Sequence, residues 1–325
     1  MPRQAVLYET AMWILRAALI LSCSAIASSP VPPAAPAPHP VDAIAVAEFD
    51  RVLSDLRARV MPDDLGAAKT DIADPWIGTS DHYRVSALRS RKVAAISANI
   101  LEGANGFFKE FLGVTRSPSS PFEAVIYPSI TEYNELGEAR YDERSSITGA
   151  FYADDAADGF LATYDSTNWN LLAQNLTYGA FQQYINWAFP NADPPAVLEQ
   201  GLAAYFASWA TPALAQYTKD QFEILRSGED AARPWIPLTQ LITGNRGSFT
   251  NRTSDRFTEL AQLILFLQFH YPDTKVKEDG TAGPFQEYVR LVFNRDRAAI
   301  GHPVYQLLTQ KTSLLEGALK GYRGW

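Results

Sequence analysis

The sequence predicts an α+β fold in which a small mixed β-sheet half is followed by a predominantly helical half. Short β-branched segments precede residue 165, whereas apolar side chains after residue 167 recur every three or four positions. Of the 325 residues, 47% are hydrophobic and 20% are charged. This composition is typical of a globular protein and disfavours wholesale disorder or a fibrous repeat.

Residues 1–27 are predicted to be an export signal. A short apolar core precedes Ala25-Ile26-Ala27, which fits the small-x-small pattern of a signal peptidase site. Two alternatives stay open: a relaxed bacterial lipobox with a lipid on Cys23, and an uncleaved anchor. Residues 28–42 are a Pro/Ala-rich tether, because proline fixes φ and has no N–H to donate. We therefore expect an exported protein that is periplasmic, secreted or lipid-anchored in a bacterial cell envelope.

Residues 43–165 are predicted to form an N-terminal α/β subdomain. Asp42 is placed to cap an amphipathic helix, which Pro62 should stop at about residue 60. The elements expected next are a strand at 81–88, a helix at 89–112, a strand at 122–127, a short helix at 130–136 and two strands within 147–165.

Residues 166–325 are predicted to form a helical subdomain, in which prolines separate successive amphipathic segments. The helices expected there cover 169–187, 195–209, 212–226, 254–270, 284–293 and 304–319.

Charge and residue usage exclude several functions. The net charge of −8 is unsuited to nucleic-acid phosphates, which require clustered Lys and Arg, so no nucleic-acid partner is expected. Cys23 is the single cysteine, so the folded part has no disulfide, thiolate zinc site or cysteine nucleophile. The four histidines are far apart in sequence, and none shares a helix turn with another.

Two consecutive predicted helices carry the most informative residues. The first contains NLLAQNLTYGAF at 170–181, and the second contains PAVLEQGLAAYF at 195–206. The second segment resembles Pro-x-Trp-Leu-x-Glu-Gly-Leu-Ala-x-Tyr-Phe of gluzincin, or peptidase-MA, zinc metallopeptidases, in which Ala-His-Glu-x-Thr-His stands a few turns upstream. The framework positions that fit both peptides are Ala173, Thr177, Gly201, Leu202, Ala203, Tyr205 and Phe206.

The resemblance extends over roughly residues 82–293. Bacterial domain-of-unknown-function proteins on this plan have a strand–helix–strand start and a Gly-Phe-Tyr hairpin before the zinc helix, and residues 147–165 are similar to that hairpin. The resemblance implies a gluzincin-like fold. It also implies that 166–325 carries the metallopeptidase motif in degenerate form.

All the reactive positions of the motif are replaced. The zinc histidines fall on Gln174 and Tyr178, the general-base glutamate falls on Asn175, and the third zinc ligand falls on Gln200. Amide oxygens and a neutral phenol are poor zinc ligands, and an asparagine cannot take a proton from water near pH 7. We therefore expect no zinc, no other cofactor and no catalytic residue. The four side chains should instead form a polar network in the former metal cleft.

Other candidates could rescue or extend the site. Glu199 neighbours Gln200 but is turned by about 100° around the helix, so we expect a solvated surface carboxylate. His270 fits a helix C-terminus, and His82 and His302 fit loops or element edges. Tyr164 is a further candidate for the cleft, beside Gln174, Asn175, Tyr178 and Gln200.

Three functions remain open at this stage. The first is a catalytically inactive pseudopeptidase that binds a peptide, a protein or a cell-wall glycan in the former active-site cleft. The second is an active peptidase or other hydrolase with a non-standard site, and the third is a purely structural or assembly module. In each case we expect membrane contact only through the N-terminal signal or a lipid.

Overall fold

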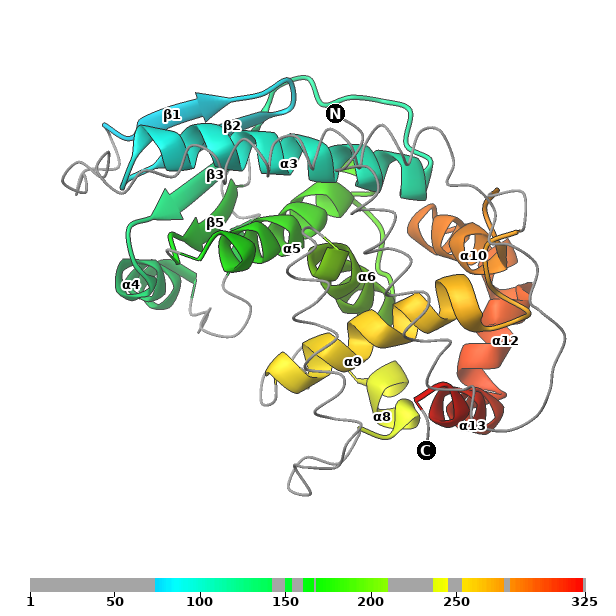
Figure 1. Ribbon diagram of the computed structural model, residues 1–325. Coiled ribbons are helices and arrows are strands. Elements are labelled where there is room, and N and C mark those ends of the chain that lie inside the picture. Colours follow the sequence, from blue (N-terminus) through cyan, green and yellow to red (C-terminus); the bar gives the residue numbers. More distant parts are fainter. Residues whose placement is uncertain are drawn as a thin grey trace, which may run out of the picture.

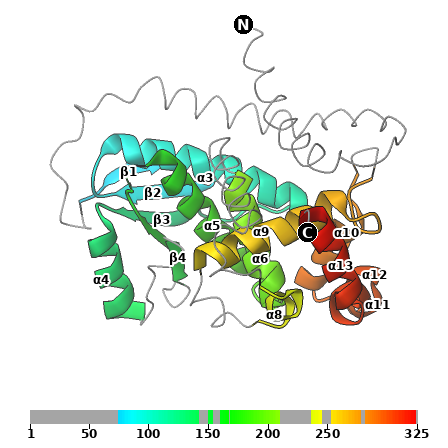
Figure 2. The same cartoon turned by 60° about the horizontal axis from the view of Figure 1, so that its bottom comes forward.

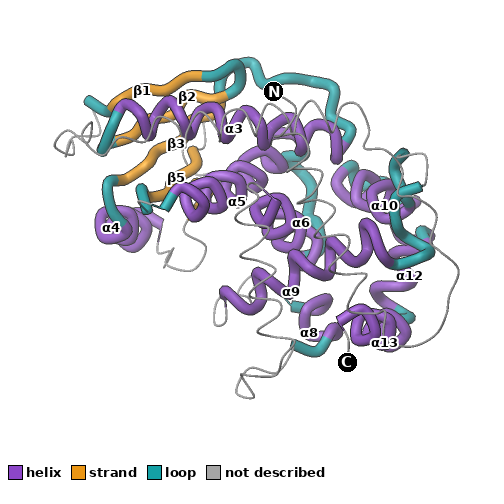
Figure 3. The backbone as a smooth tube through the Cα atoms, in the orientation of Figure 1, coloured by secondary structure: helices purple, strands orange, loops and turns teal. Residues whose placement is uncertain are grey.

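The computed structural model describes residues 74–141, 150–153, 160–166, 168–209, 236–244, 253–277 and 281–323. Within these residues the fold is mixed α+β, as predicted, with one small mixed sheet and helices in most of the remainder (Figure 3). The predicted leader, tether, helix at 42–60 and helix at 212–226 lie outside the described residues. None of the described helices is long and apolar enough to cross a membrane.

The sheet has five strands in the order β1-β2-β3-β5-β4. Its strands are β1 Trp76–Thr79, β2 Tyr83–Ala87, β3 Phe122–Tyr127, β4 Ala150–Ala153 and β5 Phe160–Tyr164. The central pairs β2–β3 and β3–β5 are parallel, whereas β1 and β4 join antiparallel at the two edges (Figure 2). In register, Val85 lies opposite Ala124, and Ala124 lies opposite Leu161.

Strand alternation divides the sheet into two apolar faces. Helix α3 (Arg91–Leu112) covers one face, and α4 (Ile130–Tyr141) lies on the other side of the sheet (Figure 1). The first face carries Val85, Ala124 and Leu161, which lie opposite one another on neighbouring strands and join the main core. The second face forms a smaller cluster of Leu88, Tyr127, Tyr133 and Ala162.

The helical half packs against the sheet through α5. Its elements are α5 Trp169–Ala188, α6 Ala196–Trp209, α8 Leu238–Thr243, α9 Thr253–Leu265, the π-helix η4 Phe266–His270, α10 Pro284–Phe293, α11 Ala298–Gly301, α12 Pro303–Thr309 and α13 Thr312–Arg323. Helix α5 packs on α3, and α6 lies between α5 and α9 (Figure 1). The close approach of α6 and α9 requires Gly201, since a Cβ there would lie 2.9 Å from Cγ1 of Ile264.

The two halves share one hydrophobic core. Phe181 on α5 packs against Phe108 on α3 and Phe206 on α6, with ring centroids 5.3 and 5.2 Å away. Arg290 of α10 donates from Nε to the Phe111 carbonyl and from Nη2 to the Glu110 carbonyl, each at 2.9 Å. These bonds join α10 to the last turn of α3, where the Glu110 carbonyl also accepts from the Gly113 N–H at 3.2 Å. The sheet half and the helical half are therefore held as one packed unit.

The predicted elements are confirmed at most described positions, with two corrections. The prediction of a single helix at 304–319 is wrong, because the helix is interrupted between α12 and α13. The hydroxyls of Thr309 and Thr312 bond back to the carbonyls of Tyr305 and Leu308, a pattern that bends helices. The short helix expected at 130–136 continues to Tyr141. Strand β1 and helices α8 and α11 were not predicted.

Candidate functional site

Helix α5, which carries three of the four replaced positions, is fixed at both ends. Asn168 caps its N-terminus by accepting from the N–H groups of Asn170 and Leu171 at 3.0 and 3.3 Å. At its C-terminus, Arg116 donates to the carbonyls of Trp187 and Ala188 at 2.9 and 2.7 Å. Its guanidinium carbon also lies 4.9 Å from the Trp187 ring centroid. Side-chain hydrogen bonds therefore hold both ends of α5, the helix that presents Tyr178 to α6.

The structure brings Tyr178 of α5 and Gln200 of α6 into direct contact. The Tyr178 hydroxyl donates to Oε1 of Gln200, and Nε2 of Gln200 donates to Oε1 of Glu199 at 3.4 Å. The sequence resemblance assigns these two positions to a zinc histidine and to the zinc glutamate of the metallopeptidase motif. Of the four side chains expected to form a polar network, these two are hydrogen-bonded to each other.

Gln174 and Asn175 flank Tyr178 on the helix but take no part in this hydrogen bond. Counted at 100° per residue, position 178 lies between 174 and 175 around the axis, so the two flanking side chains diverge to either side of it. Gln174 is half-buried, whereas Asn175 is 2% exposed. Nδ2 of Asn175 has no hydrogen-bond partner among the described residues. The network predicted for four residues therefore joins only Tyr178 and Gln200 of the four.

The prediction that Glu199 is a solvated surface carboxylate is wrong, since the residue is only 4% exposed. Helix α6 packs against α5 on one side and α9 on another, and its first turns also bury Val197, Leu198 and Leu202. Because α6 is enclosed by two helices, position 199 does not face solvent. A prediction that assumes one partner helix for α6 misses this burial. Glu199 therefore belongs to the site as the carboxylate that accepts from Gln200.

Tyr164, predicted to line the cleft, lies on the wrong face of the sheet. Its ring packs against Tyr133 of α4 at a centroid distance of 5.5 Å and belongs to the cluster on that side. The core beneath α5 is reached instead by Leu161, which points to the opposite face. The period of two along β5 accounts for this difference.

The donor atoms at the site do not fit a zinc ion. Two amide side chains, a phenol and one buried carboxylate replace the imidazole pair and the carboxylate that zinc prefers. Within the described residues, no group of three or more His, Cys, Asp or Glu side chains could hold a metal. We derive no catalytic step through a metal for this arrangement.

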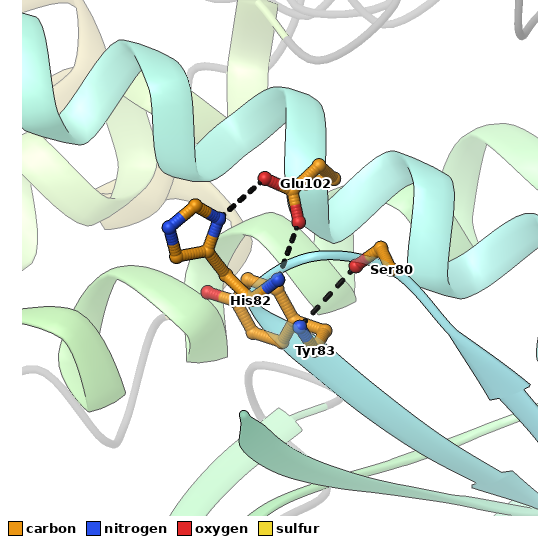
Figure 4. A network of polar contacts seen from close by, with 4 residues as sticks. All are labelled: Ser80, His82, Tyr83 and Glu102. Carbon is orange, nitrogen blue, oxygen red and sulfur yellow. Dashed lines mark hydrogen bonds and ion pairs between the residues drawn. The ribbon is translucent and has the colours of Figure 1, made fainter. Parts of the chain in front are cut away.

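A second polar constellation, which the sequence did not predict, lies where the β1–β2 turn meets α3 (Figure 4). His82 donates its backbone N–H to Oε2 of Glu102 at 2.9 Å, and its Nδ1 lies 2.6 Å from Oε1. Next to it, the Tyr83 N–H donates to Oγ of Ser80 at 3.2 Å. No sequence pattern pairs His82 with Glu102, which lies twenty positions away on α3. The arrangement orients an imidazole, but it lies apart from the Tyr178–Gln200 contact.

The other described histidines are structural. His302 caps α12 by accepting at Nδ1 from the Val304 N–H at 3.3 Å, and its ring stacks on Tyr288. Burial lowers the pKa of His302, against a smaller opposing effect of Glu287. Burial also raises the pKa of Tyr288 to about 12. His270 ends the π-helix, as predicted for a helix C-terminus, and packs on Tyr322 with ring centroids 4.8 Å apart.

Comparison with protein-family models, with curated proteins and with solved structures found no match for this chain. The metallopeptidase resemblance therefore rests on the sequence of this chain alone.

Proposed function

We propose that this chain is an exported envelope protein built on a metallopeptidase-like scaffold, which binds a peptide, a protein or a glycan without cleaving it. One observation supports the proposal: Tyr178 and Gln200, which the resemblance assigns to two zinc-ligand positions, are hydrogen-bonded between α5 and α6. On this proposal, α5 and α6 keep the framework of the metal site while its reactive groups are gone. The N-terminal leader and tether would deliver the domain to the cell envelope.

The hydrogen-bond directions at the site support a neutral ligand. Gln200 uses Oε1 to accept from Tyr178 and Nε2 to donate to Glu199, so its amide orientation is fixed. Gln174 and Gln200 are both half-buried. Amide groups can donate and accept at once, which suits a backbone peptide group or a sugar hydroxyl. The nearby Glu199 carboxylate disfavours an anion.

The sheet edge beside α5 supports an extended peptide as one such ligand. Strand β4 packs against α5 and, among the described strands, pairs only with β5. An edge strand presents unpaired N–H and C=O groups, to which an extended peptide can add as a further strand.

The test combines metal analysis with binding. The purified mature domain is assayed for bound zinc, for binding to peptide and glycan arrays, and for cleavage of every ligand that it binds. We expect less than 0.1 zinc per chain, saturable binding weakened at least tenfold by Gln200→Ala, and intact ligands. Stoichiometric zinc or chelator-sensitive cleavage would refute the proposal.

The second candidate is an active hydrolase, which the burial of Glu199 favours. Glu199 is only 4% exposed and accepts a hydrogen bond from Gln200, so its carboxylate is held in position, as the carboxylate of a general acid or base must be. Loss of cleavage in Glu199→Gln with unchanged ligand binding would establish this alternative. Absence of cleavage in the wild-type protein across the same arrays would exclude it for those ligands.

A further inference from the structure

A carboxylate holds the His82 side chain in one orientation where the β1–β2 turn meets α3. Oε1 of Glu102 lies 2.6 Å from Nδ1 of the ring, and Oε2 accepts from the backbone N–H of the same histidine at 2.9 Å. The neighbours of Glu102 on α3, Ile100 and Leu101, are fully buried, so the carboxylate stands on a packed helix. Glu102 therefore fixes both the ring and the backbone of His82 (Figure 4).

This hydrogen bond decides which ring nitrogen of His82 can react. A carboxylate only accepts, so Nδ1 carries the ring proton and, in the neutral imidazole, Nε2 carries the lone pair. Nε2 has no hydrogen-bond partner among the described residues, and it points away from Glu102 (Figure 4). The side chain is 22% exposed, so it is open to solvent. An imidazole that a carboxylate orients in this way can act as a base or as a nucleophile.

His302 provides a comparison within the same chain, because its neutral ring has the opposite tautomer. Its Nδ1 accepts from the Val304 N–H at 3.3 Å, so the ring proton lies on Nε2. The ring also stacks on Tyr288. The lone pair of His302 is thus engaged in a helix cap, whereas that of His82 is not.

The imidazole itself is the nucleophile at this site. Oγ of Ser80 accepts from the Tyr83 N–H at 3.2 Å, and the His82 ring extends away from Ser80 in Figure 4. The arrangement therefore pairs the histidine with a carboxylate but does not activate a serine hydroxyl.

We propose that His82 is an acylation site, at which Nε2 attacks the carbonyl carbon of a small activated acyl donor, such as an ester with a good leaving group. A bond forms between Nε2 and this carbon, and the bond from the carbon to the leaving group breaks, so the leaving group departs with the electron pair. Glu102 takes the Nδ1 proton and passes it to solvent, which leaves a neutral N-acylimidazole. The site is separate from the proposed groove and does not depend on any ligand bound there.

The test uses diethyl pyrocarbonate as the acyl donor and locates the labelled histidines of the mature protein by peptide mass mapping. We expect His82 to react faster than His302. Glu102→Gln should slow the labelling of His82 about tenfold, because this substitution removes the carboxylate that orients the imidazole. Glu287→Gln removes the same charge elsewhere and should leave the labelling of His82 unchanged. Labelling of His82 that is no faster than that of His302, or that is unchanged in a folded Glu102→Gln variant, would overturn the proposal.

Nitrogen NMR of the wild-type protein provides a second measurement, which does not require a variant to fold. It identifies the nitrogen that carries the proton in each neutral imidazole ring. The expected result is a proton on Nδ1 of His82 and on Nε2 of His302. A proton on Nε2 of His82 would contradict the proposal, because the lone pair would then face Glu102.

Discussion

Helix α5 has a polar region on each of two sides, and the two regions are built differently. On the α6 side, Tyr178 and Gln200 are bonded to each other, and Gln200 is half-buried. On the α3 side, Tyr83, Asn105 and Tyr184 are buried, and their side-chain oxygens have no hydrogen-bond partner among the described residues. The difference teaches that polar side chains around one helix are arranged in two ways: bonded directly to each other between α5 and α6, or enclosed beside α3 without a hydrogen-bond partner among the described residues.

The largest expected effect comes from removing the support that both regions share. Phe181 is fully buried and packs on Phe108, Phe206 and Phe293. We expect Phe181→Ala to lower the free energy of unfolding by about 3–5 kcal/mol, because a large aromatic side chain leaves a cavity. Urea denaturation measures the loss, and Asn186→Ala, an exposed change on the same helix, is the control. A loss under about 1 kcal/mol would show that the two regions do not depend on this cluster.

Smaller effects on the free energy of unfolding are expected at Tyr178, which is hydrogen-bonded to Gln200, and at Gln174, which is not. Tyr178→Phe should cost about 0.5–1.5 kcal/mol of unfolding free energy, the usual net value of one intramolecular hydrogen bond. Gln174→Ala should stay within about 0.5 kcal/mol of the wild type, since Gln174 is half-buried and has no hydrogen bond to Tyr178 or Gln200. A double-mutant cycle between positions 178 and 200 should show coupling, whereas a cycle between 174 and 200 should not. Equal coupling in both cycles would contradict the arrangement.

The smallest effect lies outside both regions and depends on pH. Burial holds the pKa of His302 below its usual 6.5, and its imidazole caps α12 by accepting from the Val304 N–H. A folded pKa below the unfolded one means that this contribution is complete above pH 6.5 and declines as the pH falls toward the folded pKa. His302→Asn keeps a capping acceptor but does not titrate, so the stability difference between wild type and variant should shrink or reverse between pH 7.5 and 5. A constant difference would show that the cap does not titrate with His302.

Helices and strands that depend on a local sequence pattern were predicted. The burial of side chains that depends on contacts between distant elements was not. The strand at 122–127 and the helix at 284–293 match the structure at both ends, since periodicity and proline mark them clearly. Strand β1 was not predicted, because it has only four residues and includes Gly78, whose lack of a Cβ allows close contact with α3. The burial of Glu199 depends on α9, which sequence spacing alone could not place, whereas the period of two along β5 already puts Tyr164 on the face opposite to Leu161.

The central claim is that the zinc site survives as a framework without its donor atoms. The most direct measurement is the metal content of the wild-type domain beside a variant with Gln174→His, Asn175→Glu, Tyr178→His and Gln200→Glu, each purified in the presence of zinc. We predict about one zinc per chain in the variant and less than 0.1 in the wild type. Zinc in the wild type, or none in a folded variant, would contradict the account.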